Sequence, residues 1–396
     1  MLNKQKIMMF SSVHVWNDTR IFYKEAMTLA DNGFTVEFYA IDNGMKLIEY
    51  PNIHIHLLKV SSSKWSRPNR WRKLYQIAKT SDAKYYHIHD PELLLLYPRL
   101  KKRKKEAIMI YDMHENFPKD IERKAWIPKL IRNPLKKWVV LMEKYTLKYC
   151  DRVVLAEASY RDDYKYIPDS KLVDVYNFPT FIPRLNLIQE IRPFTMIYVG
   201  SITKERGIFV MLEMIHVLNL RSPGKYCLKL LGPINKPLQN EINEYLVKNS
   251  IQKYVDIYGR VPYPEIWEAY RSVDLGLCLL EDIPNHRNSM ATKLYEYMAA
   301  SLPILASDFP DWKKFVEQHK TGEVCAPKNI DSLIDIVEQR AQNKERYIAE
   351  GENGRNAYEL YYNWRIEASK LLNDVYQIER EDKVDDASSK YESISS

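Results

Sequence analysis

Short apolar segments alternate with helical patterns along most of the chain, which is the rhythm of a parallel sheet wound by helices. The predicted strands of the first half are Ile7–Phe10, Thr35–Ala40, Ile53–Leu58, Tyr85–His89, Ala107–Tyr111, Arg152–Ala156 and Val173–Tyr176. Those of the second half are Thr195–Val199, Cys227–Leu231, Val255–Tyr258, Asp274–Leu280 and Ile304–Ser307. We therefore predict an α/β fold with two doubly wound parallel sheets.

The boundary between the two sheets is predicted from the absence of any period in residues 179–193, which contain several prolines. This linker divides a first domain, residues 1–180, from a second domain, residues 193–364. The charged, Ser-rich tail 381–396 has too few apolar residues to build a core and is expected to be disordered.

Residues 274–308 form the most informative stretch of the pattern: a buried strand, a polar loop over 281–290, a helix over Thr292–Ala300 and a second buried strand. In a parallel sheet the ligand crevice lies at the carboxyl ends of the strands. The loop and the helix start should line it, where free backbone N–H groups can hold an anion. Lys293 and Glu296 lie three residues apart on one side of this helix.

Two motifs here, KLYEYMAASLPILASDFPDW from Lys293 and YVGSITKERGI around Gly200, resemble the donor-sugar domain of glycosyltransferase family 4. The resemblance covers roughly residues 7–364. It implies the GT-B fold, with two Rossmann-like domains and a last helix, about 365–380, that returns to the first domain. It also implies a nucleotide-diphosphate sugar as co-substrate, retention of anomeric configuration and no essential metal.

The resemblance also implies roles for individual residues. Glu296 matches the second Glu of a Glu-x7-Glu motif and is expected to bind the donor ribose. Asn288 stands in the first position, where an amide can donate and accept but carries no charge. Arg206 and Lys293 are expected to grip the diphosphate, whose charge grows as the glycosidic bond breaks. The rest of the expected donor site is Gly200, Ser201, Ser289 and Thr292.

In the first domain, His114 in the DMHE sequence is expected to contact the donor sugar and to act with Glu296 and Arg206 in catalysis. The acceptor or phosphate side is expected to include Asp18, Arg20, His89 and Asp90, although capping of the helix Arg20–Asp31 explains Asp18 equally well. A metal held by His87, His89 and His114 is an alternative without visible supporting ligands. No Asp-x-Asp occurs in the chain.

The amino-acid composition of the chain limits the classes of ligand and binding site that can be expected. Only 11 Gly occur, with neither a dinucleotide fingerprint nor a P-loop, and the four Cys have no metal or redox spacing. Residues 1–180 hold 32 basic against 21 acidic side chains, whereas the remainder holds 27 against 31. The start of the chain lacks the pattern of a signal peptide, and no long apolar run predicts a membrane span. We therefore expect a cytoplasmic protein.

Basic runs mixed with aromatic residues lie at 65–73, 99–105 and 127–149. In the last, Asn133-Pro134 is predicted to begin a helix, with apolar residues broadly on one side: Trp138, Leu141, Met142, Tyr145 and Tyr149. Such a helix suits an anionic membrane surface, at about 1 kcal/mol for each well-placed cation. A core face with solvated lysines explains it equally well. Nucleic acid is not expected, because no recognised nucleic-acid module accompanies these runs.

Together these features predict a retaining glycosyltransferase of the hexosyltransferase type. It would move a sugar from a nucleotide-diphosphate sugar to a glycan or polyprenyl-linked acceptor in bacterial envelope polysaccharide synthesis, at the inner face of the cytoplasmic membrane. Two alternatives stay open: a sugar-nucleotide epimerase of GT-B architecture and a non-catalytic nucleotide-binding scaffold. Incubation with donor alone separates the first, and nucleotide binding without turnover would indicate the second.

Overall fold

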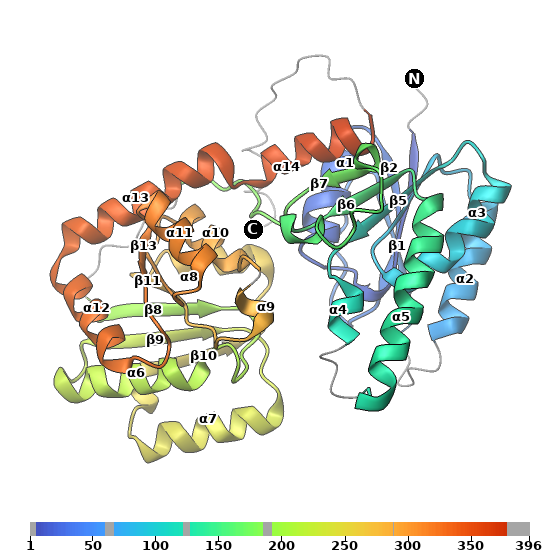
Figure 1. Ribbon diagram of the computed structural model, residues 1–396. Coiled ribbons are helices and arrows are strands. Elements are labelled where there is room, and N and C mark those ends of the chain that lie inside the picture. The colour runs from blue at the N-terminus through green and yellow to red at the C-terminus, as the bar shows by residue number, and fades with distance from the viewer. Residues whose placement is uncertain (1–4, 60–66, 122–126, 185–191, 288, 378–396) are drawn as a thin grey trace. The chain divides into compact units, whose positions relative to one another are not determined.

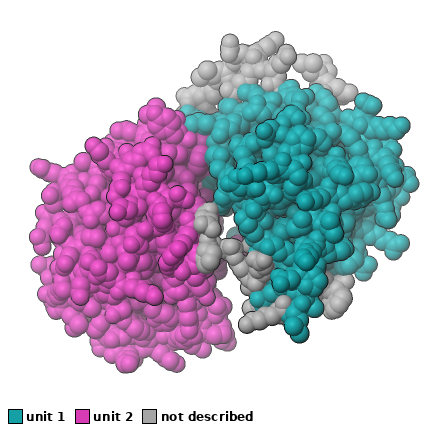
Figure 2. Space-filling model, in the orientation of Figure 1, with its two compact units in different colours: residues 1–177, 365–383 teal, residues 178–364, 384–396 magenta. Residues whose placement is uncertain are grey.

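The computed structural model describes residues 5–59, 67–121, 127–184, 192–287 and 289–377 (Figure 1). The chain divides into two compact units, coloured separately in Figure 2. Unit 1 contains the chain up to Asn177 and the segment that begins at Arg365, and unit 2 contains Phe178–Trp364. Residues 178–184 thus belong to unit 2 rather than to a separate linker. Residues 185–191 and 381–396 lie outside the described residues.

Unit 1 contains a sheet of seven strands, all parallel, in the order β3-β2-β1-β4-β5-β6-β7. The strands are β1 Lys6–Val15, β2 Thr35–Ile41, β3 Ile53–Leu58, β4 Tyr85–Ile88, β5 Ile108–Met113, β6 Arg152–Leu155 and β7 Leu172–Asp174. The order reverses between β1 and β4, so the loops after these two strands part and leave room for a ligand. β1 is longer than predicted because Val15 also pairs with Ile41 of β2.

The helices of unit 1 follow the strands in sequence. They are η1 Ile21–Ala26, α1 Met27–Asp31, α2 Arg67–Thr80, η3 Pro91–Leu96, α3 Tyr97–Arg103, α4 Phe117–Ile121, α5 Lys129–Thr146, η4 Leu147–Tyr149, η5 Ala158–Tyr160 and η6 Asp169–Lys171, with η9 Leu371–Val375 near the chain's end. Tyr376, just after η9, packs on the rings of Phe34 and Tyr85 and accepts a hydrogen bond from the Tyr85 hydroxyl through its carbonyl. The end of the chain therefore helps to close the core of unit 1.

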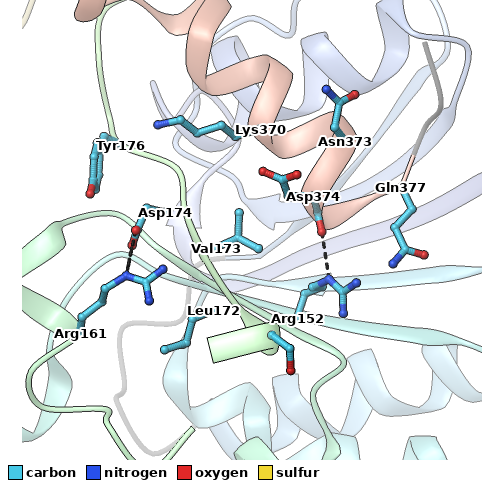
Figure 3. A pocket seen from close by; sticks show the side chains of 11 residues that line it. Arg152, Arg161, Leu172, Val173, Asp174, Tyr176, Lys370, Asn373, Asp374 and Gln377 are labelled. Atoms are coloured by element: carbon cyan, nitrogen blue, oxygen red, sulfur yellow. Dashed lines mark hydrogen bonds and ion pairs between the residues drawn. The ribbon is translucent and has the colours of Figure 1, made fainter. Parts of the chain in front are cut away.

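A cavity of about 600 Å³ lies between β7 and this C-terminal segment, lined in part by Arg161, Asp174 and Lys370 (Figure 3). Arg161 binds Asp174, and Lys370 binds Glu367. Arg161, Asp174 and Lys370 are therefore neutralised by ion pairs within the unit.

Unit 2 contains a sheet of six strands, all parallel, in the order β10-β9-β8-β11-β12-β13. The strands are β8 Phe194–Val199, β9 Tyr226–Leu231, β10 Val255–Gly259, β11 Leu275–Cys278, β12 Ile304–Ala306 and β13 Gly322–Val324. The order reverses between β8 and β11. Sequence analysis missed β13, whose three residues are all half-buried and carry no apolar run.

The helices of unit 2 are α6 Ile208–Arg221, α7 Lys236–Lys248, η7 Gln252–Tyr254, η8 Tyr263–Glu265, α8 Ile266–Tyr270, α9 Pro284–Arg287, α10 Thr292–Ala299, α11 Pro310–His319, α12 Ile330–Gln342 and α13 Lys344–Tyr361, followed by α14 Trp364–Lys370, which passes into unit 1. The core of unit 2 lies among β8, β9, β11 and helices α6, α7 and α12. None of the described helices is both long and apolar enough to cross a membrane.

One predicted helix boundary is wrong. Helix α5 begins at Lys129, and Pro134 lies inside it rather than at its start. The earlier start is explained by packing, because Ile127 and Leu135 both contribute to a small cluster with Ile121 of α4. This contact outweighs the single backbone hydrogen bond that the proline removes.

Candidate functional site

Two cationic side chains meet at the carboxyl end of the sheet in unit 2, beside the strand-order reversal. Gly200 directly follows β8, and a β-carbon there would lie 3.5 Å from Nη1 of Arg206 and 3.6 Å from Nζ of Lys293. Lys293 is buried, and Arg206 is half-buried. Within the described residues, no carboxylate lies within ion-pair distance of either cation. An unneutralised pair of cations, one of them buried, favours a bound anion at this position.

Arg206 is held at this place by the glycine that follows it. Gly207 precedes α6 with φ +76°, and a β-carbon there would lie 1.8 Å from the carbonyl oxygen of Leu279, just after β11. The loops after β8 and β11 are joined further by the Glu281 N–H, which donates to the Glu205 carbonyl at 2.8 Å. Only a residue without a side chain permits this close approach.

Helix α10 places Lys293 and Glu296 against the same edge of the sheet. The ring of Tyr297 packs where a β-carbon on Gly276 of β11 would otherwise lie, and its hydroxyl donates to the Leu277 carbonyl at 2.9 Å. Nζ of Lys293 lies 5.0 Å from the centre of the Tyr198 ring, at the end of β8. A cation over an aromatic face is partly stabilised without being neutralised.

Glu296 lies one helical turn after Lys293 and is half-buried. The hydroxyl of Tyr270 donates to its Oε2 at 3.3 Å. Burial raises the pKa of Tyr270 and of Tyr263 well above the usual range, and the charge of Glu296 adds to both shifts. Both phenols therefore stay neutral, and Tyr270 is held as a donor to the carboxylate.

The other residues expected in the donor site lie in the loop after β8, in the loop before α10 and at the start of α10. Ser201 is exposed in the loop after β8, and Thr292 is the first residue of α10. The carbonyl of Ser289 accepts a hydrogen bond from Nε1 of Trp312 at 2.8 Å, which ties the loop before α10 to α11. Asn288 lies outside the described residues.

Sequence analysis did not single out His286 of α9. Burial lowers its pKa, the Glu281 carbonyl opposes this shift, and the charges of Arg206 and Lys293 add to the lowering. Burial raises the pKa of Cys278 to about 11 against the action of the same two charges. The sequence offered one signal for His286, namely a histidine in the polar loop just before the residues expected to bind phosphate.

The histidine after β5 in unit 1, His114, is held by a buried carboxylate. Nε2 of His114 lies 2.7 Å from Oδ2 of Asp112, and Nε and Nη2 of Arg20 donate to the same carboxylate at 2.9 and 2.8 Å. Burial acts to raise the pKa of Asp112, but the charges of Arg20 and His114 outweigh it and hold that pKa well below its usual range. Since an ionised carboxylate only accepts, Nε2 of His114 carries a proton and donates it to Asp112.

This arrangement changes the expectation for Arg20. Its guanidinium is buried and also lies 3.0 Å from the Glu25 carboxylate, so it orders unit 1 rather than presenting itself to a phosphate. Asp18 accepts hydrogen bonds from the backbone N–H groups of Arg20 and Ile21 at 2.9 and 3.0 Å, as the capping alternative predicted.

The carboxyl end of β1 lies against the loop after β4. Asp90 accepts a hydrogen bond from the Ser11 hydroxyl at 2.7 Å, and one of its oxygens lies 3.4 Å from Nε2 of His14. Burial lowers the pKa of His14, but Asp18 and Asp90 outweigh it and raise the pKa to about 9. The ring of His14 lies 5.0 Å from that of His114. Unit 1 therefore collects imidazoles and carboxylates at its own strand-order reversal.

The histidine set considered for a metal is not the set that the structure gathers. Among the described residues, ligand atoms of Glu25, His87, His89 and Asp112 all lie within 4.8 Å of one another and are buried, and His114 does not belong to this group. Arg20 already lies between the two carboxylates as their counter-charge. Burial, with the nearby charge of Asp112, raises the pKa of Glu25 well above its usual range.

Comparison with known proteins gives a family match in unit 2. Residues 188–357 match the family model described as Glycosyl transferases group 1. An uncharacterized glycosyltransferase of Haemophilus influenzae is 25% identical over 218 residues, which are 54% of this chain and 58% of that protein. The chain thus spans only a little over half the length of this curated relative.

Solved structures match over nearly the whole chain. Sucrose-phosphate synthase from Thermosynechococcus elongatus gives a TM-score of 0.70 at 13% identity, covering 93% of this chain and 97% of that one. Anabaena HepE in complex with UDP-glucose gives 0.68 at 12% identity, covering 94% and 100%. Identities this low establish a common fold rather than a common substrate. Residues 188–357 therefore match a glycosyltransferase group 1 domain, and the two parallel-sheet α/β domains of the chain have the GT-B fold.

Proposed function

We propose that this protein is a retaining glycosyltransferase of family 4 that transfers a sugar from a nucleotide-diphosphate sugar to a glycan or polyprenyl-linked acceptor. The observation that carries the proposal is the convergence of Arg206 and Lys293 on Gly200 with no acidic partner among the described residues. A diphosphate supplies the negative charge that this position lacks. Several similar solved structures, among them Anabaena HepE with UDP and with UDP-glucose, are complexes with such ligands.

In this mechanism Arg206, Lys293 and the N–H groups at the start of α10 stabilise the charge that develops on the departing diphosphate. Glu296 binds the two ribose hydroxyls, and Tyr270 keeps its carboxylate oriented. The acceptor hydroxyl attacks on the face from which the diphosphate departs, so the anomeric configuration is retained. No step of this mechanism calls for a metal ion.

In this proposal His114 contacts the donor sugar, and Asp112 fixes the orientation of the His114 ring. With Nε2 protonated toward Asp112, Nδ1 of the neutral ring can accept a hydrogen bond from a sugar hydroxyl, and Nδ1 of the charged ring can donate one. Unit 1 would bind the acceptor. We further propose that the enzyme works in the cytoplasm on envelope polysaccharide precursors.

Transfer by purified protein tests the proposal, after thermal-shift screening of nucleotide-diphosphate sugars has found a stabilising donor. Arg206→Ala and Glu296→Ala should each lower kcat/KM about 100-fold or more, because each removes a group that binds the donor in the transition state. Matched controls are Lys204→Ala, in the same loop as Arg206, and Glu317→Ala on α11, both exposed. These should keep wild-type activity and the same melting temperature.

Full activity in either Arg206→Ala or Glu296→Ala would refute the assigned role. Incubation with donor alone separates the alternatives, since an isomerised nucleotide sugar would identify an epimerase. Tight nucleotide binding without transfer to any of a panel of glycan and polyprenyl-linked acceptors would instead indicate a scaffold.

A further inference from the structure

Helix α5 of unit 1 carries apolar residues on two faces, and only one of them is packed. Its inner face, Leu135, Val139 and Met142, joins the cluster of Ile121 and Ile127. This explains why one residue of the side predicted from sequence, Met142, belongs to a core. The remaining large apolar residues of the helix are not part of that cluster.

The outer face of α5, defined here as Leu130, Ile131, Trp138, Leu141 and Tyr145, is exposed, although the ring of Tyr145 also contacts that of Tyr149. These side chains are 93, 50, 56, 67 and 54% exposed, respectively. Ile131, Trp138, Leu141 and Tyr145 follow one another at spacings of seven, three and four residues, and Leu130 precedes Ile131 directly, which places all five along one broad stripe of the helix. Scattered apolar residues are ordinary on a protein surface, but a contiguous stripe this long indicates a binding surface.

Positive charge borders the stripe. Lys137, Lys144 and Lys148 are exposed along one side of it, and among the described residues none of them has a carboxylate within ion-pair distance. Glu143 is the only acidic residue from Lys129 to Tyr149, and it is buried. The solvent-exposed part of the helix is therefore apolar and cationic, without a compensating acidic group.

We propose that the outer face of α5 docks onto the surface of an anionic membrane. The helix would lie in the plane of the interface, with Trp138 and the leucines among the acyl chains and the lysines at the anionic headgroups. A second copy of this chain fits less well, because pairing two such faces would bring their lysines together without acidic partners. The inference stands on α5 alone and goes beyond the proposed transfer reaction, which needs only the sites described above.

Sedimentation of the full-length protein with lipid vesicles tests the inference. The wild type should bind vesicles of phosphatidylcholine mixed with phosphatidylglycerol and bind pure phosphatidylcholine much more weakly. A triple variant, Leu130→Ser with Trp138→Ser and Leu141→Ser, should reduce partitioning roughly tenfold or more, since it removes the inserted groups. A double variant, Lys137→Gln with Lys144→Gln, should reduce it roughly fivefold per lysine on the anionic vesicles only.

A matched control replaces exposed apolar residues elsewhere, Leu220→Ser on α6 with Val247→Ser on α7. It should bind like the wild type. Because all the replaced side chains are exposed, melting temperature and transfer to a water-soluble acceptor should remain unchanged in every variant. Failure of membrane docking is thereby distinguished from failure of the transfer reaction.

Three results would overturn the inference. The wild type could fail to bind anionic vesicles, or the triple variant could bind them as well as the wild type does. Light scattering could also reveal a wild-type dimer that the triple variant converts to monomers, in which case the face would be an interface between two copies of the chain.

Discussion

At the scale of single residues, buried cations of the two units are stabilised in different ways. Arg20 is bonded to Asp112 and Glu25, so its burial is compensated within the protein. Lys293 is buried beside Arg206 with its Nζ over the ring of Tyr198, and no carboxylate of the described residues lies within ion-pair distance of it. A compensated buried charge orders the fold, whereas an uncompensated one is retained at a cost to stability. This contrast is why we assign ligand binding to Lys293 and a positioning role to Arg20.

A second buried charge gives a prediction about pH. Burial raises the pKa of Glu143 to about 7, although the Tyr164 hydroxyl, which donates to its Oε2 at 3.0 Å, opposes the shift. Since the folded pKa lies above the unfolded value of 4.5, Glu143 stabilises the fold most below about pH 4.5. That contribution is lost as the pH rises through about 7.

Glu143→Gln removes this titration while keeping the size of the side chain. Between about pH 4.5 and pH 8, the free energy of unfolding of the variant should rise relative to the wild type by about 3 kcal/mol. Urea unfolding at a series of pH values measures the difference. Glu317→Gln, at an exposed position, is the control and should differ from the wild type by the same amount at every pH. A constant difference for Glu143→Gln would contradict the prediction.

At the scale of elements, the helices of unit 2 are placed by close backbone approaches that leave no room for a β-carbon. Helix α6 approaches the end of β11 through Gly207, and α10 lies on Gly276 through the ring of Tyr297. These contacts fix the two elements that carry Arg206 and Lys293. The positions of Arg206 and Lys293 therefore depend on the two close approaches at Gly207 and Gly276.

Gly207→Ala should destabilise the protein by about 3 kcal/mol or more, because φ +76° disfavours a side chain and the new methyl group would meet the Leu279 carbonyl. It should also weaken nucleotide binding by displacing Arg206. Gly224→Ala is the matched control, with φ +78° but no atom within 4 Å of its β-carbon, and should cost only about 1–2 kcal/mol. Urea unfolding and nucleotide titration measure both effects. Equal costs for the two variants would show that the contact with Leu279 is unimportant.

At the scale of the whole molecule, the chain closes two separate cores, one around each parallel sheet. The two units together use the whole described chain, and the segment from Arg365 returns to unit 1 after unit 2 is complete. In the proposed reaction, the diphosphate interacts with residues of unit 2.

UDP should therefore raise the unfolding midpoint of unit 2 in a calorimetric scan. At a concentration of about 100 Kd, binding to the folded form alone adds about 2.7 kcal/mol to its stability. Scans of Lys293→Ala supply the control, because the loss of one cation should remove most of the UDP effect. An equal effect of UDP on the wild type and on Lys293→Ala would contradict the placement of the nucleotide site.

The sequence by itself determined the fold class and the order of most strands along the chain. Buried parallel strands are short, continuous apolar runs, and those runs are visible without any tertiary information. The resemblance of two motifs also predicted a site with Arg206, Lys293 and Glu296, and the structure brings the first two together beside Gly200. β13 was missed because a short, half-buried edge strand has no such run.

Only the tertiary structure decided which charges are compensated and which apolar faces are covered. Arg20 looked like a phosphate ligand until Asp112, distant in sequence, was found against it, and α5 showed one apolar side until Met142 turned inward and Trp138 outward. The periodicity of the sequence shows how apolar and polar residues are distributed along a single helix or strand. Whether a charge is paired and whether an apolar face is buried depend on the residues of a second element packed against the first. The fold alone decides which element that is.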